Sequence, residues 1–156
     1  MKNKSKSFFE CNNSIFAKIR DISRKIDMLL LNTANELDIT TLQLKIVIAL
    51  DTSERQMTMG ELGKEVGVTG GNISNICKKL ERSGFVRRVR SVEDERVVYV
   101  ELTQKGNDTT KVVEKYFDNI KKDLPKEINE LHLDDILQTL TKLDKLLDKY
   151  MTRSGI

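Results

Sequence analysis

The segment from Thr58 to Thr103 constrains the fold more than any other part of this 156-residue chain. Two short helical patterns meet there near Gly67, and an arginine-rich run, an acidic turn and a second β-branched run follow. Thr58 and Glu61 have the spacing of a capping box, which predicts the start of the first helix. Gly63 lies where a second helix crosses closely, and Gly67 lies where the turn needs a positive φ. The order of the parts predicts two helices joined by a tight turn and followed by a β-hairpin, or wing.

The second helix of this segment is expected to begin at Thr69, a residue type that favours the N-cap position, and to end near Gly84. Apolar residues recur in it at intervals of three and four and form one buried stripe: Ile73, Ile76, Cys77 and Leu80. The opposite face carries no carboxylate and consists of Gly71, Asn72, Ser74, Asn75, Lys78, Lys79 and Arg82. Amides, hydroxyls and cations read base edges and bind phosphate, so this face predicts contact with DNA.

The distribution of charge favours the same interpretation. Residues 70–90 hold six Lys and Arg and a single acid, Glu81, whereas the whole chain has a net charge of only +3. This stretch is therefore +5, and the rest of the chain is net negative. Arg87, Arg88 and Arg90 alternate loosely with apolar residues, as in a half-buried strand. The alternative interpretation is that these arginines and the polar helix face are ordinary solvated surface.

The wing holds the most specific motif, which is Asp94-x-Arg96 followed by VVYVELT. On these residues the chain resembles the MarR family of winged-helix transcription regulators, and the resemblance covers essentially the whole chain. It implies that Arg96 enters the minor groove of DNA while Asp94 helps to hold the wing in shape. One departure is Gly70-Gly71 at the start of the recognition helix, where relatives often carry polar or basic side chains. Bare glycine there also permits close approach of the backbone to phosphate.

Long amphipathic helices are expected on both sides of the central segment. The first runs from Asn13 to Glu36 or Leu37, with its apolar stripe from Ile15 to Leu29. The last has the same spacing of three and four residues from Leu133 to Tyr150, followed by a frayed tail from Thr152.

Two further helices complete the predicted set. A helix capped by Thr40 or Thr41 is apolar almost all round and should be central and buried, and a loop follows it from Asp51. After the wing, Thr103 should cap a helix that ends near Leu124, because Pro125 disfavours helical geometry there. The expected fold is mainly α with a small β-hairpin wing.

We expect a single domain over residues 1–156, in which residues 40–103 form the winged helix-turn-helix and residues 13–37 and 104–150 form a dimerisation region. The winged unit alone cannot cover apolar stripes as long as those of the terminal helices. A helix-turn-helix protein also usually needs two-fold symmetry to read a two-fold site. A homodimer on an inverted-repeat operator in double-stranded DNA is therefore expected, and in the resembling family the terminal helices of both chains interlock.

Catalytic and metal-binding patterns are missing from the sequence. His132 is the only histidine and is expected at the surface. No Gly-rich phosphate loop of the Walker or dinucleotide type is present, and Cys11, Cys77 and His132 are too isolated for zinc. We therefore predict no enzyme activity, no cofactor and no metal. No segment approaches the roughly 18 apolar residues of a membrane span, and the N-terminus lacks the apolar core of a signal peptide, so a cytoplasmic protein with no membrane partner is expected.

The leading hypothesis is a sequence-specific regulator that binds double-stranded DNA. The resemblance implies a repressor whose operator affinity changes when a small-molecule effector binds between the helical dimer region and the winged domain. The predicted DNA-binding residues are Thr69, Gly70, Gly71, Asn72, Ser74, Asn75, Lys78, Lys79, Arg82, Arg87, Arg88, Arg90, Asp94 and Arg96. Two alternatives stay open: a winged-helix protein-interaction module without base readout, and a redox-sensing regulator that uses Cys11. Some members of the resembling family sense peroxide through a cysteine near the start of the first helix, although Asn12-Asn13 follow Cys11 and no tyrosine precedes Tyr99 here.

Overall fold

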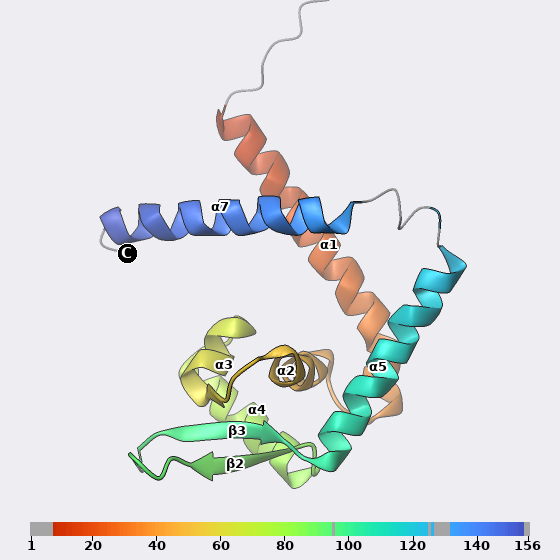
Figure 1. Cartoon of the computed structure of the whole chain (residues 1–156), viewed down its shortest axis with the longest axis vertical. Coiled ribbons are helices and arrows are strands. Elements are labelled where there is room, and N and C mark those ends of the chain that lie inside the picture. The colour runs from red at the N-terminus through yellow and green to blue at the C-terminus, as the bar shows by residue number, and fades with distance from the viewer. Residues whose placement is uncertain (1–7, 95, 125, 127–131, 155–156) are drawn as a thin grey trace, which may run out of the picture. The chain divides into compact units, whose positions relative to one another are not determined.

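The computed structural model describes residues 8–94, 96–124, 126 and 132–154, with side chains from residue 12 to residue 153 within those ranges. The elements are α1 (Phe8–Glu36), α2 (Thr41–Thr52), β1 (Met57–Thr58), α3 (Met59–Glu65), α4 (Gly70–Arg82), β2 (Val86–Arg90), β3 (Val98–Leu102), α5 (Gln104–Asp123) and α7 (Leu133–Ser154) (Figure 1). The expected class, mainly helical with a small β-hairpin, is confirmed. The chain divides into two compact units, Met1–Val113 and Glu114–Ile156, with the boundary inside α5.

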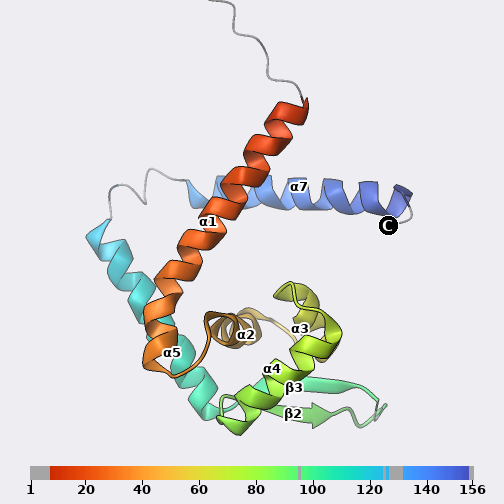
Figure 2. The same ribbon diagram turned by 180° about the vertical axis from the view of Figure 1, so that it is seen from behind.

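Helix α2 forms the centre of the first unit, where it contacts α1, α3, α4 and β3 (Figures 1 and 2). Leu44, Ile46 and Val47 are fully buried, and the other apolar side chains of the helix are half-buried. This burial on most sides is what a nearly continuous apolar helix predicts. A capping box fixes the start of α2: the Gln43 amide N–H donates to Thr40 Oγ1 (3.2 Å), and the Thr40 amide N–H donates to Gln43 Oε1 (2.8 Å). The helix continues to Thr52, so the expected loop begins two residues later than predicted.

Three short strands form an antiparallel sheet in the order β1-β3-β2. Strands β2 and β3 are the predicted hairpin, with Val86 opposite Leu102 and Arg88 opposite Val100. The sequence does not predict β1, because two residues carry no periodic pattern. Met57 of β1 pairs with Val100 of β3 and is buried, so this edge strand adds a side chain to the core.

Helix α1 begins at Phe8, five residues before the predicted start, and ends at Glu36 as predicted. Only its last turns are attached to the core of the first unit, where Leu30 and Ala34 are buried. The predicted stripe is 37–50% exposed: Ile15, Ile19, Ile22, Ile26 and Leu29. The core of the first unit therefore leaves this stripe largely uncovered.

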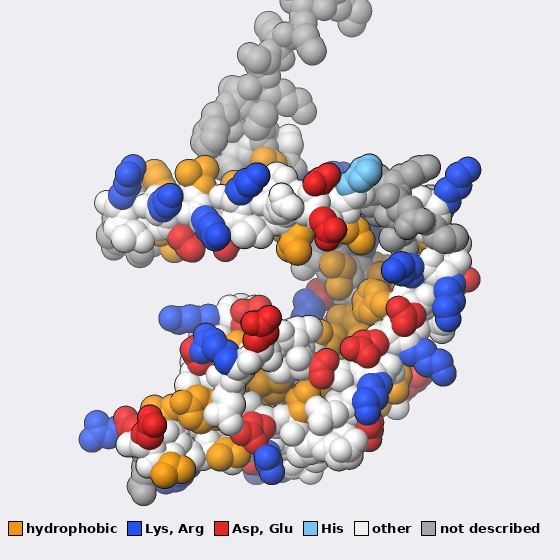
Figure 3. Space-filling view, in the orientation of Figure 1, with side chains coloured by type: hydrophobic (Ala, Val, Ile, Leu, Met, Phe, Trp, Pro, Cys, Tyr) orange, Lys and Arg blue, Asp and Glu red, His pale blue; other side chains and the backbone are white. Residues whose placement is uncertain are grey.

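The second unit consists of the end of α5 and the helix α7. Helix α5 ends at Asp123, as predicted from Pro125, which itself lies outside the described residues. Helix α7 extends to Ser154, so the expectation that the chain frays from Thr152 is wrong. Most of the predicted seam is 44–67% exposed: Leu133, Ile136, Leu140, Leu147 and Tyr150. Figure 3 shows hydrophobic side chains (orange) between charged ones along this helix. None of the described helices combines the length and apolar character needed to span a membrane.

Candidate nucleic-acid interface

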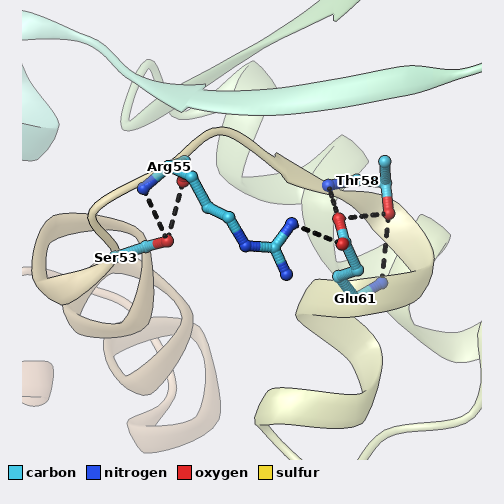
Figure 4. Close-up of polar contacts among 4 residues, drawn as sticks. All are labelled: Ser53, Arg55, Thr58 and Glu61. Carbon is cyan, nitrogen blue, oxygen red and sulfur yellow. Dashed lines mark hydrogen bonds and ion pairs between the residues drawn. The ribbon is translucent and has the colours of Figure 1, made fainter.

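The capping box predicted at Thr58 is present and fixes the start of α3 (Figure 4). The Glu61 amide N–H donates to Thr58 Oγ1 (3.2 Å), and the Thr58 N–H and hydroxyl each donate to Glu61 Oε2 (2.9 Å). Arg55 from the preceding loop donates to Glu61 Oε1 (2.6 Å), and the Ser53 hydroxyl donates to the Arg55 carbonyl (2.7 Å). The Thr58 backbone N–H and the Arg55 guanidinium lower the pKa of Glu61 to about 2. Glu61 is therefore ionised at neutral pH and anchors the first helix of the motif.

The turn between α3 and α4 depends on two glycines in the predicted roles. Gly67 has a φ of +70°, which reverses the chain in a conformation that side chains disfavour. A Cβ on Gly63 would lie 2.8 Å from the Val68 carbonyl oxygen and 3.3 Å from Ile73 Cγ2. The absence of a side chain at Gly63 therefore lets α4 cross α3 at close range.

Helix α4 buries one face and exposes the other, as predicted. Ile73, Cys77 and Leu80 are buried and Ile76 is half-buried. On the opposite face Ser74 is half-buried and the remaining residues are exposed: Gly70, Gly71, Asn72, Asn75, Lys78, Lys79 and Arg82.

Thr69 occupies the predicted N-cap position of α4, but its hydroxyl makes no capping hydrogen bond. Its carbonyl oxygen instead accepts from the amides of Asn72 (3.0 Å) and Ile73 (3.1 Å). The side chain of Thr69 is exposed. Its hydroxyl is therefore left for a partner outside the helix.

The strand arginines are engaged inside the domain. Arg88 Nε and Nη2 lie 2.7 and 2.6 Å from Glu81 Oε2, and the Arg88 amide donates to Glu81 Oε1 (3.0 Å). Arg87 Nε donates to Glu101 Oε2 (2.9 Å) and Arg87 Nη2 lies 2.8 Å from the same oxygen, while Gln56 donates to Glu101 Oε1 (2.7 Å). The hydrogen bonds from Arg88 lower the pKa of Glu81. Sequence reasoning missed these carboxylate partners, although Glu81 stood out as the single acid of a basic stretch.

Five cations of the predicted interface make no ion pair with any other residue in the described part of the chain. They are Lys78, Lys79, Arg82, Arg90 and Arg96, and all five are exposed. Three lie on α4 and two lie at the far end of the hairpin. The structure therefore places the predicted residues on α4 and the wing. It also distinguishes these five unpaired cations from Arg87 and Arg88, which form ion pairs.

The wing turn is closed by its own side chains. Ser91 Oγ accepts from the amides of Glu93 (3.2 Å) and Asp94 (3.4 Å), and Asp94 Oδ1 accepts from the Arg96 amide (2.9 Å). The Val97 amide donates to the Asp94 carbonyl (2.9 Å). Asp94 thus holds the turn, the organising role that the resemblance implies, while the Arg96 side chain is exposed.

The C-terminal end of α4 is attached to the first turn of α5. Gly84 adopts the predicted positive φ (+78°), and the Thr103 hydroxyl donates to its carbonyl oxygen (2.5 Å). Lys105 Nζ donates to the Ser83 carbonyl (2.8 Å) and lies 4.0 Å from the centre of the Phe85 ring. Thr103 Oγ1 also accepts from the Gly106 amide (3.2 Å), which confirms Thr103 as the cap of α5.

The remaining candidate residues are the two cysteines and the histidine. Burial raises the pKa of the Cys77 thiol to about 11, so Cys77 behaves as a core side chain. The side chain of Cys11 lies outside the described residues. His132 is exposed and has a φ of +43°. Within the described ranges no three His, Cys, Asp or Glu side chains come together as metal ligands.

Comparison with known proteins assigns the chain to a family. A family model described as the transcriptional regulator SarA/Rot matches residues 29–113, which are more than half of the chain. The chain belongs to the SarA/Rot family of transcriptional regulators. It is a DNA-binding regulator with a winged helix, and the matched residues include the helix-turn-helix and the wing.

Individual relatives of this SarA/Rot protein agree with the assignment. The HTH-type transcriptional regulator SarZ of Staphylococcus saprophyticus is 27% identical over 119 residues, which are 76% of this chain and 77% of that protein. The transcriptional regulator BldR from Sulfolobus solfataricus has a TM-score of 0.72 at 25% identity and covers 90% of this chain and 99% of its own. Staphylococcus aureus MepR in a DNA-binding conformation has a TM-score of 0.71 at 23% identity, covering 87% and 98%. The resemblance to MarR-like winged-helix regulators is therefore confirmed.

Proposed function

We propose that this regulator binds double-stranded DNA as a homodimer, with α4 in the major groove and the wing in the adjacent minor groove. The observation that carries the proposal is the exposed face of α4. This face presents amides, a hydroxyl and cations, and the only acid of the helix, Glu81, is neutralised by Arg88. Such a surface is suited to a polyanion whose base edges offer donors and acceptors.

The residues of the proposed interface fall into two groups: those that contact base edges and those that contact phosphate. Asn72 and Asn75 are exposed on α4 and exchange donor and acceptor bonds with a base edge, most naturally adenine. Arg96 enters the minor groove from the turn that Asp94 holds. The backbone of Gly70-Gly71 with the Thr69 hydroxyl, and the cations Lys78, Lys79, Arg82 and Arg90, contact phosphate, while Ser74 contacts either group. Arg87 and Arg88 are paired with Glu101 and Glu81, so their positive charge is less available to phosphate than that of the unpaired cations.

The terminal helices supply the dimer contact in this proposal. The stripe on α1 and the seam on α7 are both exposed, each within its own unit. A symmetry mate that covers these residues removes apolar area from water at about 25 cal/mol per Å², which exceeds the entropy cost of association when the buried area is large. Regions 13–37 and 104–150 would then form the dimerisation region, and residues 40–103 the DNA-binding region. Two recognition helices related by a two-fold axis read half-sites about 34 Å apart, which favours an inverted-repeat operator.

Three further attributes belong to the proposal. A repressor role and a small-molecule effector rest on the family resemblance alone. A cytoplasmic, non-enzymatic protein follows from a regulator that acts on the cell's DNA. Redox sensing through Cys11 stays a prediction, because its side chain lies outside the described residues.

A selection of bound duplexes from a random DNA library with the purified protein tests the proposal. We expect an inverted repeat to emerge, and the selected duplex to bind more tightly than a scrambled one at every salt concentration. Binding that shows no sequence preference and vanishes at high salt would instead favour the protein-interaction module. A shifted complex with one protein chain per operator would contradict the dimer.

A further inference from the structure

Glu81 occupies an unusual place in the DNA-binding region. It is the single acid between residues 70 and 90 and lies in the last turn of α4. Its carboxylate receives the Nε and Nη2 groups and the backbone amide of Arg88 on β2. Among the described residues, these are the only side-chain hydrogen bonds between α4 and the hairpin.

The position of this pair has two consequences for DNA binding. First, the carboxylate cancels the charge of Arg88, which would otherwise be available to phosphate. Second, the pair joins the helix that enters the major groove to the strand that leads to the wing. Both side chains are about one-third exposed (33% and 32%), so solvent screens the attraction and the pair adds little to overall stability. Its geometry matters more, because two guanidinium nitrogens of Arg88 hold one carboxylate oxygen of Glu81 and the Arg88 backbone amide holds the other, which fixes the strand against the helix.

We propose that Glu81 is a positioning residue that sets the sequence preference of the regulator. It holds the hairpin against α4, so that the recognition helix and Arg96 meet DNA at one fixed spacing, and it keeps Arg88 away from phosphate. This inference rests on the proposed DNA-binding function. When the recognition helix and Arg96 are held rigidly, they bind a matched site with little loss of conformational entropy and adapt poorly to other sites. Without the Glu81–Arg88 contact, the hairpin moves more freely against α4 and Arg88 is available to phosphate. The protein then binds any duplex better and discriminates less between sequences.

The test compares Glu81→Gln with the wild type on the selected operator and on a scrambled duplex of equal length. Freeing Arg88 should add about 0.9 per subunit to the slope of log affinity against log salt, which corresponds to a gain of up to about eight-fold for the scrambled duplex at 0.1 M salt. Affinity for the operator should fall about five-fold, because α4 and the wing are no longer held at the spacing that matches the operator. The two affinities therefore move in opposite directions, which a role in stability alone does not produce. Fluorescence anisotropy over a salt series measures both.

Two further variants separate geometry from charge. Arg88→Gln breaks the same pair without freeing a cation, and the ratio of operator to scrambled affinity should still fall. Exchanging the charges, with Glu81→Arg and Arg88→Glu together, keeps the net charge and restores the side-chain ion pair, but an arginine at position 81 cannot accept from the backbone amide of residue 88, so the ratio should recover only in part. Asp108→Asn is the matched control: it removes one carboxylate from the exposed Asp108–Lys111 pair on α5 and should leave the ratio unchanged.

The outcomes distinguish this inference from the proposed function. If Glu81→Gln or Arg88→Gln changes both affinities by the same factor, the positioning role is wrong and the DNA-binding function stands. If the wild type itself does not prefer the selected duplex, the proposed function fails, and the role of Glu81 fails with it. Thermal unfolding of each variant identifies a loss of affinity that comes from unfolding.

Discussion

Replacing Gly70 and Gly71 by alanine should stabilise the fold and weaken DNA binding at the same time. A Cβ at either position would meet no atom within 4 Å, and neither glycine has a φ in the left-handed region. Both are the first residues of α4 and are exposed. The fold therefore has no steric or conformational need for glycine at these positions, unlike Gly63 and Gly67.

The size of both effects follows from this geometry. Gly→Ala at a compatible site stabilises by about 0.4–1 kcal/mol, and the first turn of a helix favours the low end, so the pair should add about 1 kcal/mol to the free energy of unfolding. For a chain of this length that raises the unfolding temperature by about 2–4 °C. Two methyl groups would also stand between the backbone amides and a phosphate. Losing one hydrogen bond to a charged group costs about 1.5–3 kcal/mol, which lowers operator affinity by ten-fold or more.

Thermal unfolding and fluorescence anisotropy on the selected operator measure the two effects on the same samples. Gly60→Ala is the control, because Gly60 also lies in the first turn of a helix, is exposed and has no atom within 4 Å of a Cβ. It should stabilise the protein and leave DNA affinity unchanged. A double alanine variant that is more stable but binds the operator as tightly as the wild type would refute the backbone contact. A less stable double variant would refute the conformational argument itself.

Three further predictions test the wing, the acid dependence and the dimer. Arg96→Ala should lower operator affinity by about 1–3 kcal/mol without changing the unfolding temperature, and an unchanged affinity would remove its minor-groove role. Because the pKa of Glu61 falls from 4.5 to about 2 on folding, its stabilising effect is complete above the higher value and is lost as the pH falls toward the lower one. Glu61→Gln should therefore lose this part of the pH dependence of thermal unfolding, and identical pH profiles would contradict the assignment. Leu140→Asp should yield monomers or unfolded protein without specific binding, and a monomeric wild type that binds its site tightly at micromolar concentration in light scattering would contradict the dimer.

Local features of the fold were predictable because their causes lie within a few residues. The capping box joins Thr58 to Glu61, and the buried stripe of α4 follows from intervals of three and four residues. Gly67 and Gly84 mark turns through their own conformational freedom, and both have positive φ in the structure. The end of α5 at Asp123 likewise follows from a proline two residues later.

Features that depend on distant residues were not predictable from patterns. Strand β1 exists because Met57 meets Val100, a partner 43 positions away that no local signal identifies. Gln56 and Glu101, which are 45 residues apart, are joined in the same way by the pairing of the strands. The engagement of Arg88 by Glu81 needs the angle between α4 and β2, which periodicity does not supply. Sequence patterns therefore predicted which residues are exposed in the interface, but not which of them already have partners.

Only part of the positive charge counted from the sequence is free of ion pairs on the proposed DNA-binding surface. Of the seven cations among the predicted site residues, Arg87 and Arg88 are neutralised by Glu101 and Glu81. Among the described residues, positive charge without an ion pair remains on α4 and at the far end of the hairpin, separated by strand segments whose arginines are paired. A phosphate backbone attracts the protein at these two zones and less strongly between them. Two separate basic zones suit a protein that inserts a helix into one groove and the tip of a wing into the next, because each zone then meets the phosphates that border its own groove.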